Sequence, residues 1–167
     1  LRIIHTESSL GWGGQEIRIL TEAEGMLRRG HSVTLLTPEN ARIYREARKR
    51  GIPVTALPIG RKNPKGLFAL YRWLKHHPCD VINTHSSTDS WLTALATRAL
   101  RHAPPIVRTR HISAAIPANA ASRWLYQTAT VHIATTGERL RQHLIERNGF
   151  DPASMTSVPT GIDTERF

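Results

Sequence analysis

Three glycines stand directly before a helical pattern in the stretch GWGGQEIRIL, residues 11–20. Glycine at a helix start lets backbone N–H groups approach an anion closely, so Gly13 and Gly14 are candidate phosphate contacts. A dinucleotide-binding fingerprint would need Gly or Ala at position 16, where this chain has Glu16. The residues therefore disfavour an NAD-type oxidoreductase. They leave two interpretations open: an anion-binding corner, or a tight turn in which glycine supplies a positive φ.

Two histidines end predicted strands, His85 in the segment 80–85 and His111 in the segment 104–111. The carboxyl ends of parallel strands meet at one edge of a sheet, so both side chains are expected to face the same crevice. Histidine suits hydrogen bonding to sugar hydroxyls or phosphate, and also proton transfer. Because the chain has nine histidines, a surface position without a role is the competing interpretation for each.

The sequence offers no metal site and no nucleophile of a familiar kind. No pair of histidines or carboxylates has the spacing of a zinc-binding helix, and no G-x-S-x-G segment is present. The single cysteine, Cys79, excludes a disulfide within the chain. We therefore predict neither a metal nor a cofactor.

The chain carries 23 Lys and Arg against 13 Asp and Glu, a formal net charge of +10, which favours anionic partners. Six basic residues form two candidate patches: Arg42, Arg45 and Lys49 on a predicted helix, and Arg61, Lys62 and Lys65 after the third predicted strand. Each patch is either a solvated face or a contact with an anionic membrane surface, where a basic residue contributes about 1 kcal/mol. No aromatic residues interleave these stretches, which disfavours nucleic acid.

Alternating strands and helices must position these groups. Strands are predicted at 2–6, 31–37, 53–57, 80–85, 104–111, 131–136 and 155–159, and helices at 15–29, 41–50, 65–77, 86–100, 121–129 and 137–149. This alternation implies right-handed crossovers and a parallel sheet covered on both faces. We predict one α/β domain, a Rossmann-like doubly wound parallel sheet of six to seven strands. Ligands of such sheets bind outside the carboxyl ends of the strands.

Four segments, in chain order, resemble family 4 (group 1) retaining glycosyltransferases of the GT-B fold. GWGGQEIRIL is similar to the first loop of that family, and DVINTHSSTDSWLTALA to its fourth strand with a terminal histidine. PPIVRTRH resembles the fifth strand, and HIATTGERLRQHLIERNGFDPASMTSVPTGIDTERF the last helix and the crossing between domains. The resemblance covers nearly the whole chain.

The resemblance implies that residues 1–158 are the N-terminal acceptor-side domain. Residues 159–167 would then begin the interdomain crossing, and the C-terminal donor-binding domain is absent. It places Gly13, Gly14 and the adjoining Glu16 near the donor diphosphate and the acceptor. His111 would be the catalytic residue that faces the transferred sugar, and His85 would line the cleft. The resemblance also places His85 and Thr136 among the residues that bind the donor diphosphate or the acceptor. Thr136 and Thr160 stand where the family commonly has Ser and Asn.

The resemblance also implies an enzyme, a hexosyltransferase that moves a sugar from a nucleotide-diphosphate sugar to a glycan or lipid-linked acceptor of the cell envelope. We expect this chain to be inactive without the C-terminal domain. No run of residues is apolar enough to span a bilayer, and we predict a cytoplasmic protein, attached peripherally to the inner face of the membrane through its basic patches. The alternative is a nucleotide- or nucleic-acid-binding α/β module that uses the net charge.

Overall fold

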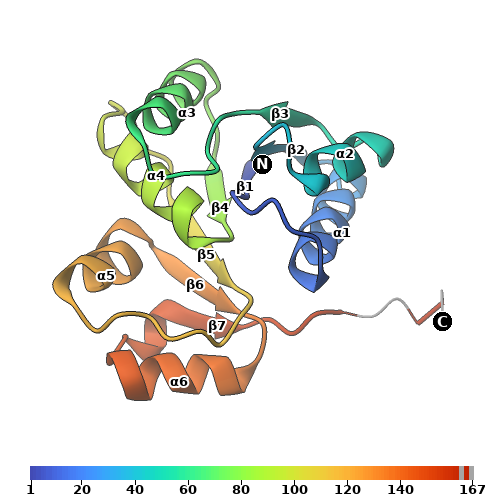
Figure 1. The fold of residues 1–167 in the computed structure, drawn as a ribbon. Coiled ribbons are helices and arrows are strands. Elements are labelled where there is room, and N and C mark those ends of the chain that lie inside the picture. Colours follow the sequence, from blue (N-terminus) through green and yellow to red (C-terminus); the bar gives the residue numbers. More distant parts are fainter. Residues whose placement is uncertain (162–163, 166–167) are drawn as a thin grey trace.

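The computed structural model describes residues 1–161 and 164–165, and its centre is a parallel β-sheet (Figure 1). The strands are β1 (Arg2–Thr6), β2 (Ser32–Thr37), β3 (Val54–Ala56), β4 (Val81–Thr84), β5 (Ile106–Arg110), β6 (His132–Thr135) and β7 (Met155–Ser157). They lie in the order β3-β2-β1-β4-β5-β6-β7, and every neighbouring pair is parallel. This confirms the predicted α/β fold and places the topological switch point between β1 and β4.

Helices cover both faces of the sheet. They are α1 (Gly14–Arg28), α2 (Arg42–Lys49), α3 (Pro64–His76), α4 (Ser87–Arg98), α5 (Ala120–Trp124) and α6 (Glu138–Asn148). One helix differs from its prediction: the α-helix expected at 121–129 ends at Trp124 and continues as a π-helical turn over Leu125–Ala129. The wider turn accompanies the burial of two successive side chains, Leu125 and Tyr126, in the same core.

Side-chain caps fix where α3, α4 and α5 begin, the last through Asn119, whose side chain accepts a hydrogen bond from the Ser122 N–H. The side chain of Asn63 accepts a hydrogen bond from the Gly66 N–H, and Pro64 occupies the first turn of α3. At α4, Ser86 and Asp89 form a capping box in which each side chain bonds the other's backbone N–H. Such caps satisfy N–H groups that have no partner inside the helix, and so they set the first residue of the helix.

The core lies on both faces of the sheet because successive strand residues point to opposite sides. Ile3 packs with Ile19 and Leu20 of α1, whereas its neighbour Ile4 packs with Leu70 of α3 on the other face. A further cluster joins β5, β6 and β7 to α6 through residues that include Ile106, Ile133, Leu144 and Met155. Within the described residues, no helix is long and apolar enough to cross a membrane.

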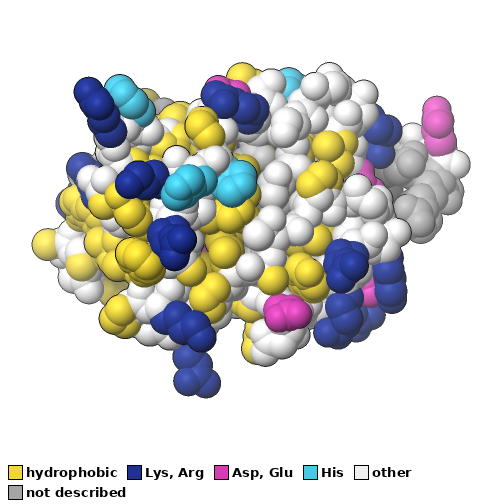
Figure 2. All heavy atoms as spheres, turned by 90° about the horizontal axis from the view of Figure 1, so that it is seen from above, with side chains coloured by type: hydrophobic (Ala, Val, Ile, Leu, Met, Phe, Trp, Pro, Cys, Tyr) yellow, Lys and Arg dark blue, Asp and Glu magenta, His cyan; other side chains and the backbone are white. Residues whose placement is uncertain are grey.

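An apolar groove remains open on the surface between α3 and α4. Its lining residues are Pro64, Leu67, Phe68, Tyr71, Leu95, Ala96 and Ala99, and its volume is about 350 Å³. Phe68 is 60% exposed and Leu95 is 46% exposed. Figure 2 shows hydrophobic side chains gathered with Lys and Arg side chains on the left of the molecule, the side on which Figure 1 places α3 and α4.

Two helical glycines should respond in opposite directions to alanine. A Cβ at Gly66 would lie 2.6 Å from the Pro58 carbonyl oxygen, so Gly66→Ala is expected to lower the free energy of unfolding by about 1–3 kcal/mol. A Cβ at Gly25 would meet only Arg28 Nη2, at 3.8 Å, so Gly25→Ala is expected to raise it by about 0.5–1 kcal/mol. Urea denaturation of both variants measures the difference, and equal effects would contradict this account of the α3 start.

Candidate functional site

A cavity of about 540 Å³ lies at the carboxyl ends of β4 and β5, next to the switch point. Its walls come from the start of α4, the end of β5 and the loop that leads to α5. The lining residues include Gln15, Lys62, His85, Ser86, Ser87, Trp91, Arg108, Arg110, His111, Ile112, Ala115, Ile116, Leu125 and Tyr126. His85 and His111 therefore face one crevice, as their positions at strand ends predicted.

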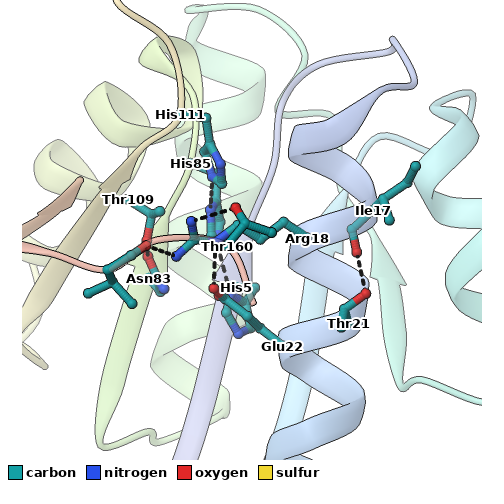
Figure 3. Close-up of polar contacts among 11 residues, drawn as sticks. His5, Ile17, Arg18, Thr21, Glu22, Asn83, His85, Thr109, His111 and Thr160 are labelled. Carbon is teal, nitrogen blue, oxygen red and sulfur yellow. Dashed lines mark hydrogen bonds and ion pairs between the residues drawn. The ribbon is translucent and has the colours of Figure 1, made fainter. Parts of the chain in front are cut away.

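Three histidine rings form a hydrogen-bonded chain that reaches this cavity (Figure 3). His5 Nδ1 lies 2.8 Å from His85 Nε2, and His85 Nδ1 lies 2.9 Å from His111 Nε2. The sequence analysis missed His5 because it is an interior residue of β1. Its place beside His85 depends on the parallel register of β1 with β4, which pairs His5 with Asn83.

The three rings are held in the neutral form. Burial lowers the pKa of His5 to about 4. Burial, followed by the charges of Arg18 and Arg108, lowers the pKa of His111 to about 4. Burial and its two histidine neighbours lower the pKa of His85 well below its usual value, and Arg108 and Arg18 add to the shift.

A neutral imidazole donates one hydrogen bond and accepts one. The three rings must therefore all donate in the same direction along the chain. His111 uses Nε2 for His85, and its Nδ1 has no hydrogen-bond partner within the described residues. Because His111 lines the cavity, a ligand there can supply the missing partner. At neutral pH the ring would act through that hydrogen bond and not as a cation.

Two buried carboxylates tie the end of β1 to the start of α4. Asp89 accepts hydrogen bonds from the hydroxyls of Thr6 and Ser8 and from the backbone N–H groups of His85 and Ser86. Glu7, which the sequence analysis also missed, accepts hydrogen bonds from the Ser9 N–H and from two side chains of the cavity wall, Gln15 Nε2 and Ser86 Oγ. Burial, followed by the charge of Asp89, raises the pKa of Glu7 to about 7.

Gly13 and Gly14, at the glycine corner, do not have the positive φ angles that require glycine. Gly13 is the N-cap of α1 with an extended backbone, φ −174°, and Gly14 is the first residue of the helix. Among the described glycines, only Gly30, Gly51 and Gly149 have positive φ, so the tight-turn interpretation of the corner is wrong. A Cβ at Gly14 would meet nothing within 4 Å. The corner thus leaves room at the helix start, and its role in binding an anion stays a prediction.

The remaining predicted site residues are spread around the edge of the sheet. Thr136 lines a second cavity, of about 530 Å³, to which His111 also contributes. The buried Glu16 lies in the first turn of α1, with Oε2 3.8 Å from the position of a Gly13 Cβ. Gly13, Gly14 and Glu16 line neither cavity. The structure brings together His85 and His111, and His111 with Thr136, and it brings the glycine corner to the first cavity only through Gln15, which follows Gly14.

The two predicted basic patches differ in their surroundings. In the first patch, Arg42 lies over the Trp12 ring, 4.9 Å from its centroid, and Glu46 lies 3.9 Å from Arg42 and 3.4 Å from Lys49. Arg45 is exposed beside them. In the second patch, Arg61, Lys62 and Lys65 are exposed, and Lys62 lines the first cavity. Among the described residues, the Glu46 carboxylate partly neutralises the first patch, and no such ion pair is found in the second patch.

Arg18 joins α1 to the segment that follows β7, a contact with no signal in the sequence. It is buried, and its guanidinium donates to the Val158 carbonyl oxygen at 2.8 Å and to Thr160 Oγ1 at 3.0 Å (Figure 3). Thr160 therefore has a defined partner. Of the predicted crossing segment 159–167, residues 162, 163, 166 and 167 lie outside the described residues.

A family model and a curated relative match this sequence. The sequence profile described as Glycosyltransferase Family 4 matches residues 12–166. A UDP-Gal:alpha-D-GlcNAc-diphosphoundecaprenol alpha-1,3-galactosyltransferase of Escherichia coli is 30% identical over 114 residues, which are 64% of this chain and 29% of that protein.

Solved structures share the fold at low sequence identity. A glycosyltransferase from Rickettsia africae superposes with a TM-score of 0.80 at 18% identity, over 98% of this chain and 44% of its own. HepE of Anabaena, in complex with UDP-glucose, superposes with a TM-score of 0.78 at 14% identity, over 97% and 44%. This chain thus spans less than half the length of these relatives.

The raised pKa of Glu7 predicts a pH-dependent effect of Glu7→Gln. Between pH 4.5 and about 7 the unfolded chain loses the Glu7 proton while the folded chain keeps it, so the wild type loses stability as pH rises. The neutral variant has no such loss. Its free energy of unfolding relative to the wild type should therefore rise by about 1.4 kcal/mol per pH unit across this window. Denaturation at a series of pH values measures this difference, and a flat difference would contradict a protonated Glu7.

Proposed function

Because the chain belongs to glycosyltransferase family 4, we propose that it is the acceptor-side half of a retaining hexosyltransferase. The donor would be a nucleotide-diphosphate sugar, and the acceptor a glycan or lipid-linked glycan of the cell envelope. The names of the relatives support this choice: the E. coli galactosyltransferase uses UDP-Gal and a diphosphoundecaprenol-linked sugar, and HepE was solved with UDP-glucose. A donor-binding half would be supplied by further chain.

The observation that carries the proposal is the position of His111. Its neutral ring ends a buried histidine chain and lies at the rim of a cavity beside the carboxyl ends of the strands, and its Nδ1 has no partner in the described part of the chain. Such a ring can bond a sugar hydroxyl without adding a charge to the site. The resemblance requires no protein nucleophile, so this domain would orient the sugar and the acceptor while cationic groups stabilise the departing diphosphate.

The second part of the proposal is peripheral attachment to an anionic membrane surface through α3 and α4. Exposed Phe68 and Leu95 offer apolar area, and Arg72 lies over the Phe68 ring, 5.8 Å from its centroid. The patch Arg61, Lys62 and Lys65 adjoins the start of α3, whose first residue is Pro64. Apolar side chains next to basic ones are the combination that binds an anionic lipid surface. This favours the second basic patch over the first.

Replacement of His111 tests the transfer reaction. In the complete polypeptide that carries these residues, His111→Ala is expected to lower kcat/KM for sugar transfer roughly 2- to 10-fold, because a hydrogen bond between neutral groups contributes about 0.5–1.5 kcal/mol. His102→Ala, at an exposed histidine outside the site, is the matched control and should leave transfer unchanged. Transfer at the wild-type rate by His111→Ala would remove His111 from the mechanism.

Vesicle binding tests the membrane contact. Phe68→Asp adds a charge to the exposed apolar groove and should weaken co-sedimentation with vesicles that contain anionic lipid, about tenfold or more. Val131→Asp makes the same change at another exposed apolar residue, before β6, and should bind like the wild type. If binding does not depend on lipid charge, or if both variants bind equally, the α3–α4 surface is not the contact.

A further inference from the structure

Two arginines at the end of β5 are buried, and neither forms an ion pair with a described residue. Arg108 is 2% exposed and Arg110 is 6% exposed, and both line the 540 Å³ cavity. Within the described residues, no carboxylate oxygen lies within 4.0 Å of either guanidinium. The charge of Arg108 acts on Asp89 from a longer distance. A buried charge is costly unless an opposite charge compensates it, so this pair needs an explanation.

The hydrogen bonds of the two guanidinium groups go to neutral acceptors. Arg108 Nη1 donates to the Ser86 carbonyl oxygen and to Ser90 Oγ. Arg110 donates to the Ala114 carbonyl oxygen and to the Tyr126 hydroxyl. Nε of each arginine is buried and has no hydrogen-bond partner among the residues that the structure describes. Burial lowers the pKa of Arg110, because the charged guanidinium is removed from water. The protein therefore holds two positive charges at the cavity with neutral hydrogen-bond acceptors, and Arg108 also lies over the Tyr126 ring, 5.8 Å from its centroid.

The rest of the cavity wall adds to this positive potential. Lys62 is a third cation of the lining, and no Asp or Glu is among the lining residues. Ser87, the first residue of α4, also faces the cavity, so the positive end of the helix dipole adds to the field. On another wall, Trp91, Ile112 and Ile116 provide apolar surface. The lining thus combines cations with apolar side chains.

We propose that this cavity binds a phosphate or diphosphate group through Arg108 and Arg110. A guanidinium matches the oxygens of a phosphate, and an anion in the cavity would compensate both buried charges. Gly13 and Gly14 do not line this cavity, although Gln15, the residue that follows them, does. The compound that carries the phosphate follows from the proposed function: it is the donor nucleotide or a diphosphate-linked acceptor. The apolar wall suits a group attached to the phosphate in either compound.

Inorganic pyrophosphate is the first probe. Thermal unfolding of the protein is compared in pyrophosphate and in chloride at equal ionic strength. Pyrophosphate is expected to raise the wild-type Tm by several degrees, because a ligand that binds only the folded state stabilises it. Arg110→Gln should lose most of this shift. Arg123→Gln is the matched control, because Arg123 lies on α5, bonds the Asn148 carbonyl oxygen and does not line the cavity, so its shift should stay.

A second variant tests the site independently, in case Arg110→Gln does not fold. Ala115 is an exposed lining residue, and Ala115→Glu places a carboxylate at the mouth of the cavity without removing a buried side chain. It should also abolish the pyrophosphate shift. In chloride alone, Arg110→Gln should unfold within a few degrees of the wild type, because removal of an unpaired charge offsets the lost hydrogen bonds. A wild type without a pyrophosphate shift, or an equal shift in Arg110→Gln and Ala115→Glu, would overturn the proposal.

Two further ligands distinguish the source of the phosphate. Binding of UDP and of a sugar diphosphate on a short alkyl chain is measured by calorimetry for the wild type and Arg110→Gln in the complete polypeptide. A tenfold or larger loss of affinity for the sugar diphosphate alone assigns the cavity to the acceptor, and a loss for UDP alone assigns it to the donor. Unchanged affinity for both ligands would overturn the site.

The two proposals can fail separately. A pyrophosphate shift that depends on Arg110, in a protein that transfers no sugar, would support the anion site and contradict the proposed function. Sugar transfer by Arg110→Gln with wild-type KM values for donor and acceptor would support the function and remove the site.

Discussion

The carboxylate of Asp89 holds the site together. It accepts hydrogen bonds from the hydroxyls of Thr6, at the end of β1, and Ser8, just after it, and from the two N–H groups that directly precede α4, and it is completely buried. Since β1 and β4 lie on the two sides of the switch point, this one group fixes the distance across the crevice. The histidine chain and the bonds from Gln15 and Ser86 to Glu7 span the same gap. Their geometry depends on that distance.

The electrostatics of this edge of the sheet follow from burial more than from ion pairs. Burial favours the neutral forms of His5, His85 and His111, and it raises the pKa of the carboxyls of Glu7 and Asp89. Arginine does not lose its proton in this way, so Arg108 and Arg110 remain the fixed charges of the cavity. The result is a set of neutral hydrogen-bonding groups beside two cations. This combination recognises an anion and leaves the neighbouring rings free to orient a polar ligand.

The strand and helix order, the parallel sheet and the convergence of His85 and His111 could be predicted from the sequence, because they depend on local periodicity and on strand ends. His5, Glu7 and Arg18 could not, because their roles depend on register and on contacts between distant segments. Arg108 and Arg110 had a usable signal: two arginines alternate within a strand that a parallel sheet buries on both faces. Charged residues at such positions need partners or ligands, and this signal was overlooked. The π-helical turn after Trp124 has no recognisable mark in the sequence.

The bonds from Arg18 to Val158 and Thr160 tie α1 to the segment that follows β7. β7 lies at the far edge of the sheet from β3, yet the chain that leaves β7 is fastened to the helix that follows β1, close to the middle of the sheet. The residues that follow β7 are therefore held beside the central strands and not at the edge strand β7. The helix that holds them begins at the glycine corner, so one rigid element joins the two.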